Sequence, residues 1–235
     1  MAELSPKTRE ALARVGTSTL TGILSRRGFK NMFMQEVWPI RPDQPRLVGI
    51  AYTMRFIPAR EDKTRNPAAG PIQQQAMEGC PPGHVLVMDC RNDPIGASGG
   101  DILLTRLMKR GVAGVVTDGS FRDSPTIAKL PFPAFVQGMS PNISLTRHHA
   151  VDMQVPIACA GIAVYPGDVL VGDEEGIMVI PRGIVAEVAA GAVERDLSEE
   201  FVMEKIHAGA SITGVYPFSD ETKREYEAWK AKRKK

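Results

Sequence analysis

The segment Gly96–Asp123, GASGGDILLTRLMKRGVAGVVTDGSFRD, constrains the fold more than any other part of the chain. After a glycine-rich turn, apolar pairs at 103–104 and 107–108 place one hydrophobic face on a predicted helix. The β-branched run at 113–119 follows as a strand. An earlier apolar run, Val85–Cys90, predicts a strand that is covered on both faces. This order of strand, helix and strand is typical of a right-handed crossover, so the sequence predicts an α/β fold.

Three charged side chains stand at the ends of these predicted elements. Asp101 begins the helix, and Arg122 and Asp123 directly follow the next strand. In a crossover unit the start of the helix and the end of the following strand lie at one edge of the sheet, so these groups can face one pocket. The first helical amides, at Ile102 and Leu103, are donors at the positive end of the helix dipole. This edge is therefore the candidate site.

The residue types indicate the chemistry that such a site would support. Arginine can bind a carboxylate through two parallel hydrogen bonds. An aspartate suits Mg²⁺, which keeps several waters and takes only one or two protein carboxylates. Each residue alone also has a structural interpretation, Asp101 as a helix N-cap and Arg122–Asp123 as a surface ion pair of little energetic value. The arrangement of all three groups at one edge is what favours a site.

The rest of the chain is predicted to form helices, strands and turns within a single domain. The predicted elements are a helix at Ser5–Arg14, a second helix capped by Ser18 or Thr19 and closed by Gly28, a strand at Arg46–Pro58, a short helix at 72–79, an antiparallel hairpin block at Pro156–Pro181 and a long helix at 182–209. With no linker or internal repeat, residues 1–235 are predicted as one domain with a core at about 15–210. The polar segment at about 214–235 is predicted as a tail whose end, KAKRKK, is disordered.

Composition excludes several classes of protein. The net charge is +2 and much of the positive charge lies in the last thirteen residues, a distribution that does not favour a nucleic-acid enzyme. No run of about 18 apolar residues is present to span a membrane, and the N-terminus lacks the apolar region of a signal peptide. The three cysteines, Cys80, Cys90 and Cys159, have no metal-ligand spacing and are predicted as buried free thiols, which together with these features indicates a cytoplasmic protein.

Other polar residues are less suited to a site. Asp168 and Asp173 stand in predicted turns, where aspartate is common for conformational reasons. His148 and His149 fall in a polar stretch with no third metal ligand nearby and are predicted to be surface residues. The sequence contains no nucleophile elbow, phosphate-binding loop or zinc-protease motif.

With these residues identified, the chain resembles the RraA-like family, which includes the regulators of ribonuclease E activity and the class II 4-hydroxy-4-methyl-2-oxoglutarate/4-carboxy-4-hydroxy-2-oxoadipate aldolases. The resemblance rests on GVAGVVTDGSFRD, which is similar to the family signature G-x-x-G-x-[VI]-x-D-[GA]-x-x-R-D. The segments GASGGDILLTRLMKRG, PGDVLVGDEEGIMVIP and TSTLTGILSRRG support it, and together they cover roughly residues 15–210. It implies an α/β/β/α swivelling-domain fold assembled as a homotrimer or homohexamer with sites between subunits.

The resemblance also implies roles for individual residues. Asp123 would bind Mg²⁺ or Mn²⁺, Arg122 would bind the pyruvyl part of the substrate, and Asp101 would order a metal-bound water for proton transfer. The substrate carboxylate would be held at the start of the helix by Gly100, Ile102 and Leu103. A neighbouring subunit would contribute an acid, for which Glu199 is the match and Glu194 and Glu200 are alternatives.

We therefore expect a divalent-metal-dependent lyase that cleaves a 4-hydroxy-2-oxo dicarboxylic acid to pyruvate and a second keto acid. The same chemistry would permit oxaloacetate decarboxylation as a side activity. Two alternatives are a non-catalytic regulator of ribonuclease E that binds a protein or RNA partner, and a different lyase or dehydratase on the same scaffold.

Overall fold

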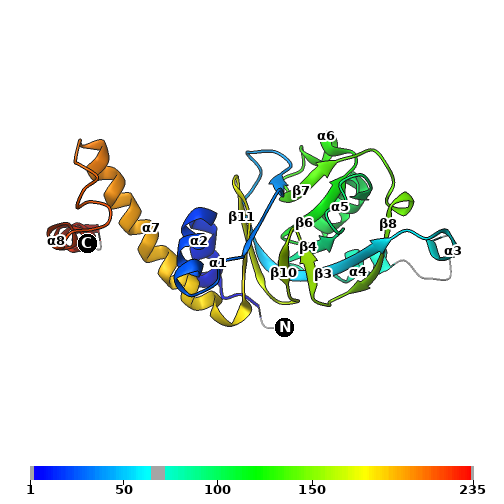
Figure 1. Cartoon of the computed structure of the whole chain (residues 1–235), viewed down its shortest axis with the longest axis horizontal. Coiled ribbons are helices and arrows are strands. Elements are labelled where there is room, and N and C mark those ends of the chain that lie inside the picture. Colours follow the sequence, from blue (N-terminus) through cyan, green and yellow to red (C-terminus); the bar gives the residue numbers. More distant parts are fainter. Residues whose placement is uncertain (1–2, 65–71, 234–235) are drawn as a thin grey trace.

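The computed structural model describes residues 3–64 and 72–233 and has the predicted α/β architecture (Figure 1). Its elements in chain order are α1 (Pro6–Arg14), α2 (Thr17–Arg26), β1 (Phe33–Met34), β2 (Trp38–Pro39), β3 (Leu47–Pro58), α3 (Glu61–Thr64), α4 (Ile72–Gly79), β4 (His84–Asp89), β5 (Ala97–Gly99), α5 (Asp101–Lys109), β6 (Gly114–Phe121), α6 (Ser124–Ile127), β7 (Ala134–Met139), η1 (Ser144–Thr146), β8 (His148–Met153), β9 (Ile157–Cys159), β10 (Ile162–Val164), β11 (Val169–Asp173), β12 (Gly176–Ile180), η2 (Arg182–Ile184), α7 (Val185–His207) and α8 (Asp220–Arg233). None of the described helices is long and apolar enough to cross a membrane.

One large sheet runs through the molecule in the strand order β1-β12-β11-β3-β4-β6-β7-β2. Its centre is parallel, since β3 pairs with β4, β4 with β6 and β6 with β7 in parallel register. Its other half is antiparallel through β3, β11, β12 and β1. The predicted hairpin block is confirmed, because β9 pairs with β10 and β11 with β12 in antiparallel register.

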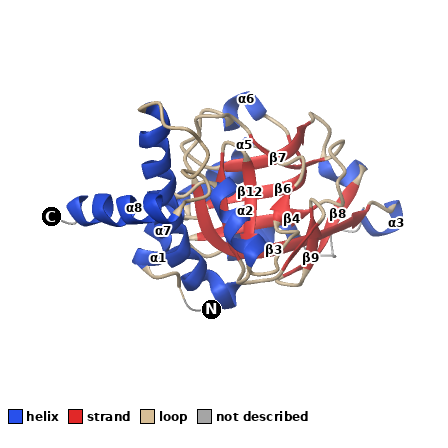
Figure 2. Cartoon of the chain, turned by 60° about the vertical axis from the view of Figure 1, so that its left-hand side comes forward, coloured by secondary structure: helices blue, strands red, loops and turns tan. Residues whose placement is uncertain are grey.

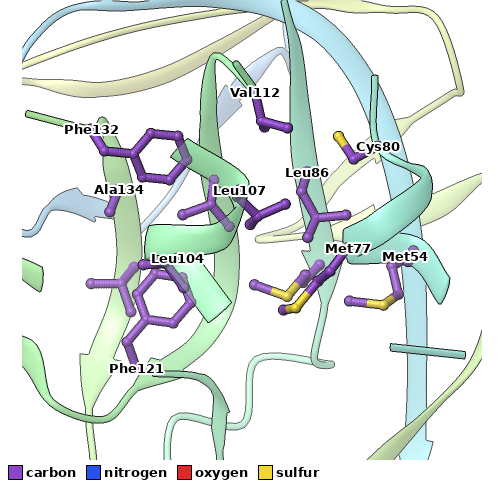
Figure 3. Packing of buried hydrophobic residues seen from close by; sticks show 14 of the residues in the cluster. Met54, Met77, Cys80, Leu86, Leu104, Leu107, Val112, Phe121, Phe132 and Ala134 are labelled. Atoms are coloured by element: carbon purple, nitrogen blue, oxygen red, sulfur yellow. The ribbon is translucent and has the colours of Figure 1, made fainter. Parts of the chain in front are cut away.

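The four layers follow from the alternation of apolar residues along the strands. On β11, Val169 and Val171 pack towards α1, α2 and α7, whereas Leu170 faces the opposite way. On β4, Leu86 packs towards α4 and α5, whereas Val87 joins Leu170 in a cluster between the two halves of the sheet. Figure 3 shows the outer cluster beneath α4 and α5. The order of packing is therefore helix, sheet, sheet, helix, and the predicted α/β/β/α arrangement is confirmed.

The first two helices begin differently from one another. Ser5 caps α1 as predicted, and its hydroxyl accepts a hydrogen bond from the Thr8 amide (3.1 Å). The predicted cap of α2 is wrong, because Gly16 occupies the N-cap position and offers no side chain. The Thr17 amide donates instead to the Asp173 carboxylate (2.7 Å), which belongs to the β11–β12 turn. Asp173 is therefore structural, as predicted, but it acts across the fold as a helix cap.

Residues 220–233 of the predicted polar tail form α8, so the prediction of disorder for KAKRKK is wrong for residues 230–233. Figure 1 shows α8 beside the C-terminal part of α7, away from the sheet, and Figure 2 shows it projecting from α7 with the C-terminus at its tip. Tyr226 is buried there and Trp229 stands 5.5 Å from Phe201 of α7, ring centre to ring centre. Residues 234–235, at the end of the predicted disordered segment, lie outside the described residues.

Candidate functional site

The crossover unit brings the predicted site residues to one edge of the sheet. β5 leads through Gly100 into α5, and the chain returns through β6, which pairs in parallel with β5. The Arg122 amide donates to the Gly99 carbonyl (3.0 Å), so the end of β6 is fixed beside the start of α5. The predicted juxtaposition of the helix start and the strand end is therefore confirmed.

Gly100 lies directly against the Arg122–Asp123 pair. A methyl group at its Cα would lie 2.7 Å from Asp123 Oδ2 and 3.0 Å from Arg122 Cγ, so a larger residue here would displace these two side chains. Asp123 has a left-handed backbone (φ 56°, ψ 30°), which turns the chain sharply into α6. Its carboxylate stands 3.3 Å from Arg122 Nε, with side-chain exposures of 36% for Asp123 and 45% for Arg122. Both charged groups therefore remain accessible to a ligand.

Asp101 is the first residue of α5 rather than its N-cap, which is Gly100. Its carboxylate accepts the amide of Ile102 (2.7 Å), so this predicted substrate-binding amide is already engaged by a side chain. The Leu103 amide precedes the first intrahelical bond, from Leu104 to Gly100 (3.1 Å), and remains a donor at the helix start. Of the two predicted amides, only that of Leu103 is available to donate to an anion in this conformation.

The glycine-rich turn before α5 is held by partners that the sequence does not reveal. Gln73 of α4 donates through Nε2 to the Ser98 carbonyl (2.7 Å), and the Ser98 hydroxyl donates to the Ser120 carbonyl (3.0 Å). The Ser98 side chain is fully buried. These bonds fix the turn on both sides, which positions Asp101 relative to Arg122.

Asp118 is a buried acid that sequence reasoning did not single out. Its carboxylate accepts backbone amides from Cys90 (2.5 Å), Asn92 (3.0 Å) and Ala160 (3.2 Å). Burial raises the pKa of Asp118, although these three amide bonds act in the opposite direction. Asp118 therefore ties the segment after β4 and the β9–β10 turn to the strand that ends at the candidate site.

The three cysteines are buried free thiols, as predicted. Burial raises the pKa of Cys80 to about 12 and raises the pKa values of Cys90 and Cys159 as well. Because the reactive form of cysteine is the thiolate, these side chains are unsuited to nucleophilic catalysis.

The surface prediction for His148 is wrong. His148 begins β8 and is fully buried, with its ring 4.9 Å from that of Phe56 in an edge-on contact. Neither ring nitrogen has a hydrogen-bond partner among the described residues. Because η1 and β8 are short, this stretch has no apolar periodicity that would predict burial, and pairing of β8 with β3 brings His148 inwards.

This burial predicts a specific pH dependence of stability. Burial lowers the pKa of His148, so the folded protein keeps the ring neutral while the unfolded chain takes up a proton below about pH 6.5. The unfolded state then binds more protons, and the free energy of unfolding falls as pH drops below that value. We expect wild type to lose more stability than His148→Phe between pH 7.5 and 5.5 in urea titrations. His207→Gln, at an exposed site, should retain the wild-type pH dependence. Parallel curves for wild type and His148→Phe would contradict this.

Glu199 lies on α7, on the opposite side of the sheet from α5 (Figure 1). Its carboxylate accepts the Thr19 hydroxyl (2.9 Å) and Arg195 Nε (2.7 Å). The two alternatives on α7 are engaged by α8, Glu194 by Lys230 and Tyr226 and Glu200 by Arg233. Within one chain Glu199 is therefore not part of the Asp123 cluster, and of the three acids it is the one whose partners lie on α2 and α7 rather than on α8.

The donor set fits a hard divalent cation better than a structural metal. Among the described residues no group of three or more His, Cys, Asp or Glu side chains could hold a metal ion, which disfavours a zinc site. Asp123 offers one accessible carboxylate, and Asp101 a second at the adjacent helix start. Mg²⁺ is commonly bound by one or two carboxylates together with waters and substrate oxygens, so the residues present suit that ion.

Comparison with known proteins agrees with this fold. The family model RraA-like (Aldolase/RraA) matches residues 17–179, which include Asp101, Arg122 and Asp123 but not Glu199. A Halalkalibacterium halodurans protein named "Putative 4-hydroxy-4-methyl-2-oxoglutarate aldolase" is 35% identical over 127 residues, which are 54% of this chain and 60% of that protein. The chain spans less than two thirds of the length of this relative.

Solved structures resemble the chain over more of its length. Streptomyces coelicolor RraAS2, described as an unusual member of the RNase ES inhibitor RraA family, is 27% identical with a TM-score of 0.76, over 86% of this chain and 98% of that one. An uncharacterised Pseudomonas syringae protein shares the fold with a TM-score of 0.80 at 24% identity, over 92% of this chain and 100% of that one. The signature at the end of β6, the four-layer fold and the family match agree, and the chain belongs to the RraA-like (Aldolase/RraA) family.

Proposed function

We propose that this protein is a divalent-metal-dependent lyase that cleaves a 4-hydroxy-2-oxo dicarboxylic acid by a retro-aldol reaction. The observation that carries the proposal is the contact of Gly100 with the Arg122–Asp123 pair, which leaves the start of α5 and both charged groups facing the same space. The name of the Halalkalibacterium halodurans relative supports the same reaction class.

In this proposal the residues of the chain bind and orient the substrate. The ion pair with Asp123 uses only Nε of Arg122, and its terminal nitrogens have no partner in the described part of the chain. Those nitrogens can bind the pyruvyl carboxylate and keto oxygen of the substrate. The Leu103 amide and the helix dipole add a donor for the same negative charge.

The bond changes follow from this orientation. The 4-hydroxyl group gives up its proton towards the Asp101 carboxylate while the C3–C4 bond breaks and its electrons pass to C3 and the keto oxygen. C4 becomes the carbonyl carbon of the second keto acid, and protonation of C3 gives pyruvate. Arg122 stabilises the negative charge that develops on the keto oxygen. A cation held by Asp123 supplies further positive charge there when it is bound. Loss of CO₂ from oxaloacetate would develop the same charge, which makes decarboxylation an expected side activity.

Assembly completes the proposal. Glu199 lies far from Asp123 of its own chain, so its catalytic contribution requires a second subunit (Figure 1). We propose a homotrimer or homohexamer in which Glu199 of one subunit approaches the Asp123 cluster of another.

The direct test is a pyruvate-release assay over a panel of 2-oxo-4-hydroxy acids, with EDTA, Mg²⁺ or Mn²⁺ added. We expect release with at least one dicarboxylic substrate, loss of turnover in EDTA and recovery when the metal is restored. Pyruvate release that is insensitive to EDTA, or absent from the whole panel with either metal, would contradict the proposal.

A second candidate function is regulation of a ribonuclease, favoured by the likeness to Streptomyces coelicolor RraAS2 over nearly all of that chain. Co-precipitation of a ribonuclease from cell extract, by a protein that releases no pyruvate, would favour this function over the first.

A further inference from the structure

The buried ring of His148 lies against the segment that leads into the candidate site. Its strand, β8, runs along β3 (Figure 1). A methyl group at the Cα of Gly96 would lie 3.5 Å from Cε1 of the ring, so the ring packs against the backbone at this glycine. Gly96 precedes β5, and β5 continues through Gly100 into α5. The ring therefore supports the start of the glycine-rich turn.

Two further contacts hold the same segments together. Arg147 donates two hydrogen bonds to Asp93 Oδ2, from Nε (3.2 Å) and from a terminal nitrogen (3.0 Å). The Ala97 amide donates to the Asn142 carbonyl (3.0 Å). The connection before β5 is thus fixed to the connection after β7 by an ion pair and by a backbone bond, with the histidine ring packed beside them.

The charges that act on the His148 ring disfavour a proton on it. Arg91, Arg147 and His149 oppose a positive charge there. Asp93 favours one, but its carboxylate is already paired with Arg147. Burial, together with the three opposing groups, keeps the pKa of the ring below its usual value.

The other elements packed on this ring bring no free carboxylate to it. β3 presents the uncharged ring of Phe56, 4.9 Å away in an edge-on contact. α4, which also packs on β8, carries Glu78 as its one charged residue, and Glu78 pairs with Arg106 and Arg110. Since neither ring nitrogen has a partner among the residues that the structure describes, a protonated ring would be a buried charge without an acceptor.

We propose that His148 is an acid-sensitive switch: on taking up a proton the ring leaves its buried position, and residues 93–100 separate from the segment before β8. Asp101 and the Leu103 amide follow residues 93–100 directly, so they lose their fixed position beside Arg122. The site is then organised at neutral pH and opens reversibly in mild acid while the rest of the sheet stays folded. The switch does not rest on the proposed function, because it would act on any ligand held at the start of α5.

Hydrogen exchange of the full-length protein at pH 7.5 and 5.5 tests this switch. Each amide's rate is divided by the rate of an unstructured chain at the same pH, which gives its protection. In the open form the ring has the ordinary histidine pKa of about 6.5, so opening becomes up to about tenfold more frequent between these two pH values. We expect the protection of the Ala97 amide to fall by that factor.

Added urea distinguishes local opening from global unfolding. Below the unfolding transition at pH 5.5, the protection of Ala97 should be low and nearly independent of urea, because local opening exposes little surface. Amides of the β11–β12 pair should be better protected, and their protection should fall steeply with urea. If Ala97 is as well protected as β11–β12 and follows the same urea dependence at both pH values, His148 acts on global stability alone and the switch is overturned.

His148→Phe removes the titrating ring and keeps an aromatic side chain beside Phe56, so the protection of Ala97 should no longer depend on pH. His84→Gln is the matched control, since His84 is also nearly buried but its Nδ1 lies 3.2 Å from the Pro82 carbonyl oxygen. This control should keep the wild-type fall at Ala97. An equal fall in His148→Phe would overturn the proposal, as would unchanged protection in wild type, a measurement that needs no variant to fold.

Discussion

Asp123→Asn is expected to lower kcat/KM for pyruvate release by about 10²–10³-fold, the range seen when one group that stabilises developing charge is removed. Asparagine tolerates the left-handed backbone that Asp123 adopts (φ 56°), so the turn into α6 should be kept. What is lost is the negative charge that would hold a divalent cation beside Arg122. The residual rate of the variant should therefore no longer rise with added Mg²⁺ or Mn²⁺.

The matched control is Asp43→Asn, because Asp43 also pairs with an arginine near it in sequence (Arg41, 2.7 Å) but stands elsewhere on the surface. This control should keep the wild-type rate and metal dependence. Circular dichroism and the urea midpoint should be the same for both variants within error. Unchanged Mg²⁺-dependent turnover in Asp123→Asn would show that the cation, if used, is held elsewhere.

The sequence predicted those parts of the fold that depend on local periodicity. The nearly continuous apolar run at Val85–Cys90 and the β-branched run at 113–119 correctly indicated buried central strands, and the Leu103–Met108 pattern indicated the helix between them. The position of Arg122 beside the start of that helix could be predicted because nearly all crossover connections between parallel strands are right-handed.

The wrong predictions concern residues whose state depends on distant partners. The cap of α2 comes from Asp173, 156 residues away from Thr17 in the chain, so no local pattern could reveal it. The polar segment that forms α8 has weak amphipathic character, and contacts of Tyr226 and Trp229 with Phe201 of α7 are what give it a packing surface. His148 is buried through the pairing of β8 with β3, a contact between segments about 90 residues apart.

Asp118 is the most informative of the residues whose role could not be predicted from the sequence. It stands in the family signature, yet its side chain is fully buried and points to backbone amides rather than to the candidate site. Two of those amides, at Asn92 and Ala160, follow or belong to residues with left-handed backbone, where no regular strand can satisfy them. The buried Asp118 carboxylate therefore stabilises both turns, because it accepts the Asn92 and Ala160 amides.

For this reason we expect Asp118→Ala to be the most destabilising single change among those considered, by about 3–5 kcal/mol. Each buried amide left without an acceptor costs about 1–3 kcal/mol, and three would lose theirs, while the removal of a buried charge returns part of that cost. Asp118→Asn should also destabilise, because its amide group would face at least one backbone donor. Urea unfolding at fixed protein concentration measures both effects.

Asp152→Ala is the control for the loss of an aspartate that accepts a backbone amide. Asp152 accepts the Met153 amide (2.9 Å) at an exposed position, where water can replace the carboxylate. We expect this variant to lose less than about 1 kcal/mol. Equal destabilisation by Asp118→Ala and Asp152→Ala would mean that water reaches the three amides. In that case the turns at Asn92 and Ala160 would not depend on the buried carboxylate, and the position of β6 at the candidate site would have to be maintained by the pairing of β6 with β4, β5 and β7.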